Sequence, residues 1–163
     1  MLKKFIVPGL FFFIFSVFPL NAANISFLVI ETGLPRGSRT NQYSTMWENG
    51  LLDVFFDSGY IVTNAPIMRL YETPGDNFPY EAERDFRGAG DGGMDYFIIA
   101  IINYPSPRGA ANPRPLTVTL RLFNTSSEEM IHEQIITNMT GRNTRDEFNN
   151  IRRAVSEFAA VLP

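Results

Sequence analysis

The chain has 163 residues, no cysteine and a formal net charge of −3 at neutral pH, and this length suits one domain. Lys3 and Lys4 are its only lysines, so the rest of the chain sets 12 arginines against 17 acidic residues, a net charge of −5. That balance argues against a general nucleic-acid binder, which needs a net basic face, and against adhesion to an anionic membrane through a polybasic patch.

The first 22 residues are typical of a secretory signal peptide. Lys3 and Lys4 precede a very apolar run over residues 5–20, and Ala22 offers a small residue for cleavage. We therefore predict a signal peptide at residues 1–22 and a single periplasmic domain at residues 23–163. The alternatives are secretion from the cell, or an uncleaved segment that tethers the protein to the inner membrane. Because cysteine is absent, we expect no lipid anchor after cleavage.

Strands and helices alternate over the first two thirds of the chain. An unbroken apolar run at residues 97–102 predicts a strand that is buried on both faces. Alternation of this kind indicates parallel strands joined by crossover helices. The predicted order is strand, helix, strand, helix, strand, at residues 24–30, about 41–57, 60–65, about 79–88 and 95–104.

The pattern changes after a loop at residues 104–115 that is rich in Pro and Arg. Apolar and polar residues alternate over residues 116–124, which predicts a strand with one buried face, and residues 130–137 predict a strand antiparallel to it. An amphipathic helix follows, and Thr144 with Glu147 fits a capping box at its start. The predicted fold class is therefore α/β: a mixed five-stranded sheet in the order 2-1-3-4-5, covered by three helices.

Three parts of the sequence together resemble a family of envelope domains. Residues 47–62 read as a helix, a Gly and the opening of a strand, residues 93–96 (GMDY) precede the apolar strand, and residues 116–124 begin a hairpin. The pattern is similar to the domain shared by the TolB amino-terminal region, the curli-secretion CsgG group and LpoB-type activators of penicillin-binding proteins. The resemblance spans about residues 24–162. It implies a non-enzymatic envelope protein that works by contacting other proteins.

The residues suited to catalysis or metal binding do not form a recognisable constellation. His132 is the only histidine, and Glu133 should lie on the opposite face of the same strand. Asp91 and Asp95 match no known metal-binding loop. Residues 33–38 follow a strand, where phosphate loops lie, but they lack the Gly-Lys-Ser/Thr ending. We therefore expect neither an enzyme nor a bound metal or cofactor.

Two loops form the strongest candidate site. If the first and third strands are parallel, the loops that follow them share one end of the sheet, where open α/β sheets bind ligands. Arginine suits such a site because it binds carboxylate or phosphate with two hydrogen bonds. Ordinary solvated loop charge is the competing interpretation. The candidate binding residues are Arg36, Gly37, Ser38 and Arg39 in the first loop and Arg108 and Arg114 in the second.

The leading hypothesis from the sequence is an exported, non-catalytic adaptor or accessory protein of the cell envelope. It would act through contacts with one or more envelope proteins, or as an oligomer. The alternative is a module that binds a small anionic ligand with the Arg-rich loops. Catalysis is the third hypothesis, because no acid, base and nucleophile converge in the sequence, and nucleic acid is not an expected partner.

Overall fold

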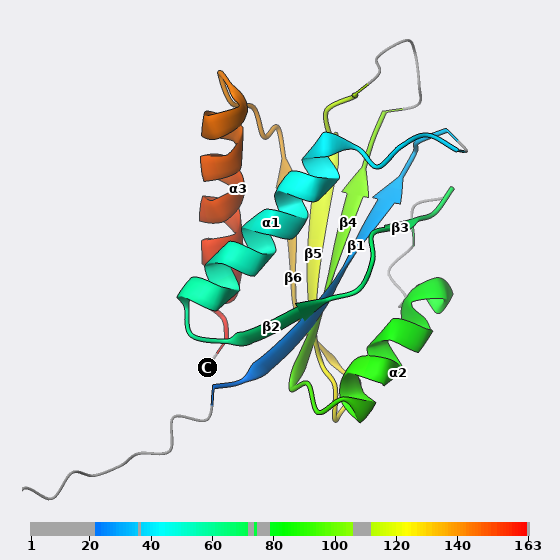
Figure 1. Ribbon diagram of the computed structural model, residues 1–163, viewed down its shortest axis with the longest axis vertical. Helices are drawn as coiled ribbons and strands as arrows, with labels where there is room; N and C mark the ends of the chain where they lie inside the picture. Colours follow the sequence, from blue (N-terminus) through cyan, green and yellow to red (C-terminus); the bar gives the residue numbers. More distant parts are fainter. Residues whose placement is uncertain (1–21, 36, 72–73, 75–78, 106–111, 163) are drawn as a thin grey trace, which may run out of the picture.

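A mixed sheet with helices on both faces forms the centre of the structure (Figure 1). The computed structural model describes residues 22–35, 37–71, 74, 79–105 and 112–162. The strands are β1 (Asn24–Thr32), β2 (Ile61–Asn64), β3 (Met68–Arg69), β4 (Tyr96–Asn103), β5 (Thr117–Asn124) and β6 (Met130–Thr137). The helices are α1 (Gln42–Asp57), α2 (Glu83–Asp91) and α3 (Thr144–Ala159), and a short 3-10 turn, η1 (Tyr80–Ala82), leads into α2.

The strands follow the order β2-β1-β4-β5-β6. β1 runs parallel to β2 and β4, whereas β5 is antiparallel to both β4 and β6. This arrangement confirms the predicted α/β class, strand order and terminal hairpin. The two-residue strand β3 also pairs with β1, and it raises the number of strands from the predicted five to six. It follows Pro66, which interrupts the edge strand because proline has no N–H to donate.

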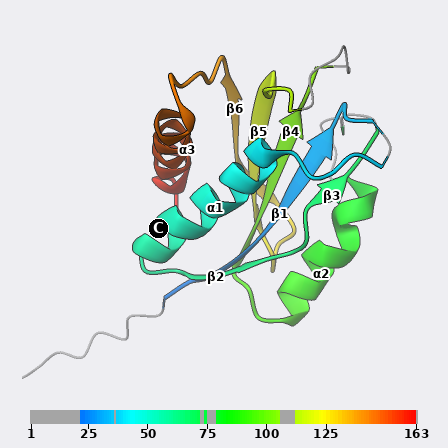
Figure 2. The same ribbon diagram turned by 45° about the horizontal axis from the view of Figure 1, so that its top comes forward.

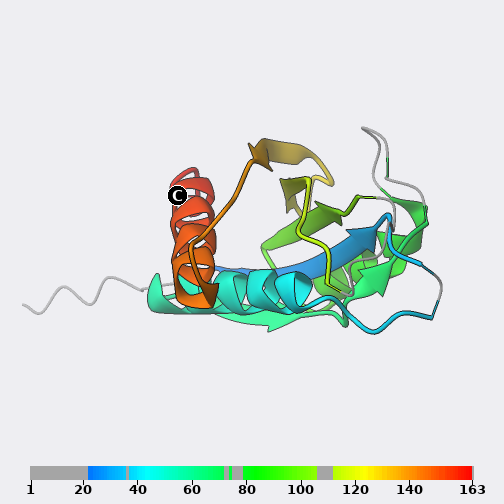
Figure 3. The ribbon, with the colours of Figure 1, turned by 90° about the horizontal axis from the view of Figure 1, so that it is seen from above.

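Two helices cover one face of the sheet and one covers the other. Phe27 and Val29 of β1 belong to a buried cluster with α1 and α3, and Leu28 and Ile30 belong to a second cluster with α2. Figure 3 shows α1 and α3 together on one side of the curved sheet. β4 also divides its side chains between the two clusters, which explains why its sequence is apolar without interruption.

The structure corrects two details of β5. Leu116, which the alternation places on the buried face, lies just before the strand and is 54% exposed. Arg121, expected on the wet face, is only 5% exposed. Its Nε donates to Oε2 of Glu133 on the neighbouring strand at 2.7 Å. The ion pair allows the charged side chain of Arg121 to be buried at this position, because a buried charge needs a partner.

The start of α3 also differs from the prediction. Asn143 caps the helix, and its Oδ1 accepts a hydrogen bond from the N–H of Asp146 at 2.9 Å. Thr144 is therefore the first helical residue, and the Thr144–Glu147 capping box was wrong. Glu147 is instead buried, and it joins the contacts described below.

No helix within the described ranges is both long and apolar enough to cross a membrane. Residues 1–21 of the expected signal peptide lie outside those ranges. Export and cleavage after Ala22 therefore stay predictions.

The close contact between α1 and α3 predicts the effect of substituting a glycine. An ideal Cβ atom on Gly50 would lie 2.5 Å from Cγ2 of Ile151, a branched methyl with little freedom to move. Gly50→Ala is expected to lower the free energy of unfolding by about 1–3 kcal/mol through overpacking. Gly88→Ala on α2 is the matched control, because its Cβ would meet nothing within 4 Å. There alanine should raise stability by up to about 1 kcal/mol, so equal thermal midpoints would contradict this packing.

Candidate functional site

The loops after β1 and β4 lie at one end of the sheet, as the parallel register of these strands requires (Figure 2). Residues 33–41 connect β1 to α1, and residues 104–116 connect β4 to β5. The two loops touch, because Nδ2 of Asn41 donates to the carbonyl oxygen of Pro113 at 3.1 Å. Asn41 is also the N-cap of α1, so one side chain links the helix start to both loops.

A buried carboxylate organises the first loop. Glu31, near the end of β1, is 1% exposed. Its Oε2 accepts hydrogen bonds from Nε of Arg69, at 3.1 Å, and from Nη2 of the same side chain. Its Oε1 accepts the N–H of Asn41 at 2.7 Å. The charge of Glu31 is therefore balanced by a guanidinium, and both carboxylate oxygens have donors, which buried charges require.

Arg69 also holds the loop that carries the predicted site residues. Its Nη1 donates to the carbonyl oxygen and to Oγ of Ser38, at 2.7 and 2.8 Å. Its Nη2 donates to the carbonyl oxygen of Arg39 at 3.1 Å. Gly37 takes a positive φ of 72° in the turn before these residues. One arginine on the short strand β3 thus attaches Ser38 and Arg39 to the end of the sheet.

Tyr104 is the first residue of the second loop, directly after β4, and it contacts α1. Its hydroxyl lies 2.7 Å from Oγ of Ser44, in the buried start of α1. Burial raises the pKa of Tyr104, with the hydrogen bond to Ser44 acting in the opposite direction. The phenol therefore stays neutral at physiological pH and holds α1 against the end of β4. Gly33 passes so close to the carbonyl of Tyr104 that a side chain would collide with it, and its φ is +80°.

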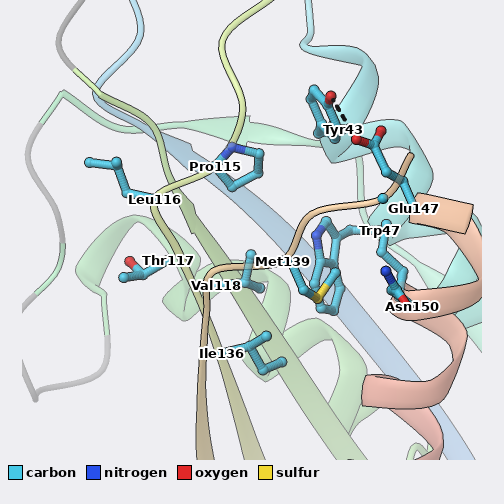
Figure 4. A pocket seen from close by; sticks show the side chains of 12 residues that line it. Tyr43, Trp47, Pro115, Leu116, Thr117, Val118, Ile136, Met139, Glu147 and Asn150 are labelled. Carbon is cyan, nitrogen blue, oxygen red and sulfur yellow. Dashed lines mark hydrogen bonds between the residues drawn. The ribbon is translucent and has the colours of Figure 1, made fainter. Parts of the chain in front are cut away.

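An apolar groove opens beside these loops, between α1, α3 and the first residues of β5 (Figure 4). Trp47 lies deep within it and is almost fully buried, whereas Leu116 is more than half exposed at its margin. The enclosed space that admits water amounts to only about 20 Å³. The apolar side chains that line the groove are Trp47, Pro115, Leu116, Val118, Ile136, Met139 and Ile151.

A small polar network borders this groove. Nη2 of Arg114 lies 2.5 Å from Oε1 of Glu147 on α3. Nε of Arg114 donates to the hydroxyl of Tyr43 at 3.0 Å, and that hydroxyl donates to the same oxygen of Glu147 at 3.4 Å (Figure 4). Glu147 is buried while Arg114 is half exposed. Arg114 therefore fixes the second loop to the first turn of α3 and still presents part of its guanidinium to solvent.

The predicted site residues divide into three groups. Gly37, Ser38 and Arg39 are exposed and lie on the loop that Arg69 holds. Arg114 lies on the second loop, at the margin of the groove. Arg36 and Arg108 lie outside the described residues. The two loops do meet at the end of the sheet, and a binding role for their arginines remains a prediction.

Sequence reasoning missed Glu31, Arg69 and Glu147. An acidic residue directly after an apolar strand was the available signal for Glu31, but nothing local pointed to Arg69 as its partner. Of the residues considered for chemistry, His132 packs its ring 5.5 Å from the ring of Phe158. In the part of the chain that the structure describes, no cluster of three His, Asp or Glu side chains could hold a metal ion.

Comparison with known proteins places the sequence in a family. A family model described as "uncharacterised protein" matches residues 30–160. The chain belongs to that family. No curated protein matches it in sequence.

Several solved structures are similar to this chain at low sequence identity. PelC from Paraburkholderia phytofirmans, solved as a dodecamer, has a TM-score of 0.47 at 11% identity, covering 85% of this chain and 86% of that one. Lipoprotein GNA1162 from Neisseria meningitidis has a TM-score of 0.47 at 10% identity, covering 85% and 99%. The LpoB C-terminal domain from Salmonella enterica has a TM-score of 0.42 at 10% identity, covering 72% and 84%. An LpoB-type domain is thus among the similar structures, while the TolB and CsgG assignments stay predictions.

Proposed function

We propose that this protein is an exported, non-catalytic accessory protein of the cell envelope that binds another protein at the loop end of its sheet. One observation carries the proposal: an apolar groove adjoins two Arg-bearing loops that are tied to each other and to the sheet. Large apolar side chains and arginines contribute most of the binding energy at many protein interfaces.

The groove offers apolar contact area to the surface of a partner rather than an enclosed site for a free small molecule. Small-molecule sites usually enclose about 300–1,000 Å³, far more than the roughly 20 Å³ that admits water here. So little enclosed space cannot hold a whole side chain either, so a partner would instead contact the apolar margin of the groove with a larger surface. Leu116 offers exposed apolar area at its margin, and its burial by a partner would be favourable.

The arginines would favour a partner that carries an acidic segment next to the apolar surface that covers Leu116. Arg39 is exposed, and Arg114 presents part of its guanidinium beside the groove. Arg36 and Arg108 lie outside the described residues, and their part in binding is carried over from the sequence prediction. The bonds from Arg69 to Ser38 and Arg39 hold the first loop before a partner arrives, so less conformational entropy is lost on binding.

The test is recovery of a partner from the host envelope with tagged protein. We expect the protein in the periplasmic fraction, with an intact mass for a chain that begins at Ala23 or Asn24. The loop variant replaces Arg36, Arg39 and Arg108 with alanine and keeps Arg114, because removing Arg114 would leave Glu147 buried without its cation. The groove variant is Leu116→Asp. Each should reduce recovery of a specific partner by more than about tenfold, a loss of about 1.4 kcal/mol.

The matched control replaces three arginines outside the two loops, Arg84, Arg87 and Arg153, with alanine, and it should recover the partner like the wild type. Thermal midpoints of all variants should stay within a few degrees of the wild type, so that a loss of recovery reports binding and not unfolding. Unchanged recovery by both the loop and groove variants would refute the proposal. A small anion retained in native mass spectrometry, and lost only in the loop variant, would support the ligand-binding alternative instead.

A further inference from the structure

The open edge of β6 is a second surface with a definite geometry. β6 pairs with β5 and is the last strand of the sheet. In Figure 3 it lies at the outer margin, with no other described element drawn beyond it. An edge strand presents unpaired N–H and C=O groups that can pair with another strand.

Two backbone hydrogen bonds determine which groups face that edge. The N–H of Thr125 donates to the carbonyl of Asp95 at 3.1 Å, and the N–H of Asn124 donates to the carbonyl of Glu129 at 3.0 Å. Bonding alternates along an antiparallel strand. Odd-numbered residues of β5 therefore bond to β4, and even-numbered residues bond to β6.

The register between β5 and β6 shifts by one residue between Leu122 and Phe123, so the pairing changes its numbering after Glu129. The even-numbered residues of β6, His132, Gln134 and Ile136, stand opposite even-numbered residues of β5, so their backbone groups are used within the sheet. The odd-numbered residues Glu133 and Ile135 consequently turn their N–H and C=O groups to the open edge, as does Thr137.

The side chains of β6 do not protect this edge. Ile135 is 62% exposed, and Met130 and Ile131 are each 48% exposed. Glu133 is the only acidic residue of the strand, which has no lysine and no proline. Its carboxylate is already paired with Arg121. Charges and prolines are the usual devices that keep an edge strand from pairing, and Glu133 is the only one of them in β6.

We propose that β6 pairs with β6 of a second copy, antiparallel about a two-fold axis at Ile135, so that one sheet continues through a homodimer. In this register Ile135 faces Ile135 of the second copy, and Glu133 faces Thr137 on both sides of the axis. All three residues have edge-directed backbone groups, so each pair can exchange two hydrogen bonds. The same patch serves both copies, as a two-fold interface requires.

The charge of Glu133 favours this register over others. An axis at Glu133 would set two carboxylates directly opposite each other, and like charges in that position are destabilising. An axis at Ile135 instead places the two apolar Ile135 side chains opposite each other, and each Glu133 carboxylate opposite a Thr137 hydroxyl. β6 is therefore complementary to a second copy of itself. Its sequence has no run of like charges that would favour an oppositely charged strand from another protein. This surface is separate from the groove, so the inference does not depend on the proposed function.

Cysteine cross-linking tests the register, because the natural chain has no cysteine. The Cα atoms of a hydrogen-bonded antiparallel pair are about 5.5 Å apart, within the range of a disulfide. Ile135→Cys should therefore form a covalent dimer on mild oxidation. Ile61→Cys is the matched control, since Ile61 is also exposed and lies on the opposite edge strand β2. It should stay monomeric on a non-reducing gel. Self-linking of Glu133→Cys in place of Ile135→Cys would overturn the register.

The oligomeric state tests the interface itself. Size-exclusion chromatography with light scattering should show a dimer for the wild type and for Ile61→Lys, and a monomer for Ile135→Lys. Thermal midpoints measured at low concentration should be similar for both lysine variants, because both sites are exposed. A monomeric wild type at its highest soluble concentration would overturn the proposal. So would a dimer that survives Ile135→Lys, because it would use another surface.

Discussion

Arg69→Ala is expected to lower the free energy of unfolding by about 3–5 kcal/mol, the usual cost of leaving a buried charge without its partner. Glu31 is 1% exposed, and Arg69 supplies its cation. Without the guanidinium the carboxylate would lose its cation and keep the hydrogen bond from the N–H of Asn41. The loop at Ser38 and Arg39 would also lose the bonds that attach it to β3.

Chemical denaturation measures this effect, and the exposed pair Arg87–Glu83 is the control. Arg87 and Glu83 form an (i, i+4) ion pair in which both side chains are substantially exposed, so Arg87→Ala should cost about 0.5 kcal/mol or less. The double variant Glu31→Gln with Arg69→Ala should recover a large part of the loss, because the amide removes the buried charge and still accepts from Asn41. If Arg69→Ala and Arg87→Ala have equal midpoints, Glu31 does not rely on Arg69.

Val155→Asp is expected to abolish stable folding. Val155 is fully buried on the inner side of α3, in the cluster shared with α1 and the sheet. A carboxylate there would have no cation and would lose the apolar contacts of valine, and such substitutions fall among the most destabilising known, above about 4 kcal/mol. A domain of this size has a total stability of about 5–15 kcal/mol. The variant should therefore accumulate as insoluble or degraded protein.

Ser156→Asp is the matched control, because it places the same side chain on the next, exposed residue of α3. It should fold and melt within a few degrees of the wild type. Arg152→Ala should also be mild: its ion pair with Asp57, at 2.8 Å, is partly exposed on both sides, and such pairs contribute about 0–1 kcal/mol. Comparable soluble yields for Val155→Asp and Ser156→Asp would mean that the buried face of α3 is misassigned.

Local sequence patterns were enough to predict the three helices, five of the six strands and the order of those strands in the sheet. The reason is that these features depend on local periodicity: the apolar run of β4 requires cover on both faces, and the spacing of Ile151, Val155 and Phe158 requires a helix with one buried side. Alternation of strands and helices then restricts the sheet to few topologies. The strand order, the parallel first half and the terminal hairpin were all predicted on this basis.

The contacts that hold the candidate site join residues far apart in the chain, so local sequence patterns could not predict them. Arg69 and Glu31 are 38 residues apart in the chain, and no periodic pattern links them. Arg114 was predicted as a loop cation, and only the packing of α3 brings it to Glu147. Which residues a long charged side chain pairs with depends on how the loops pack and on which carboxylates become buried. A buried charge is stable only when a partner lies beside it. The predicted strand order already placed residues 130–137 at one edge of the sheet, but only the structure shows which of their backbone groups face outward, because that depends on the register between β5 and β6.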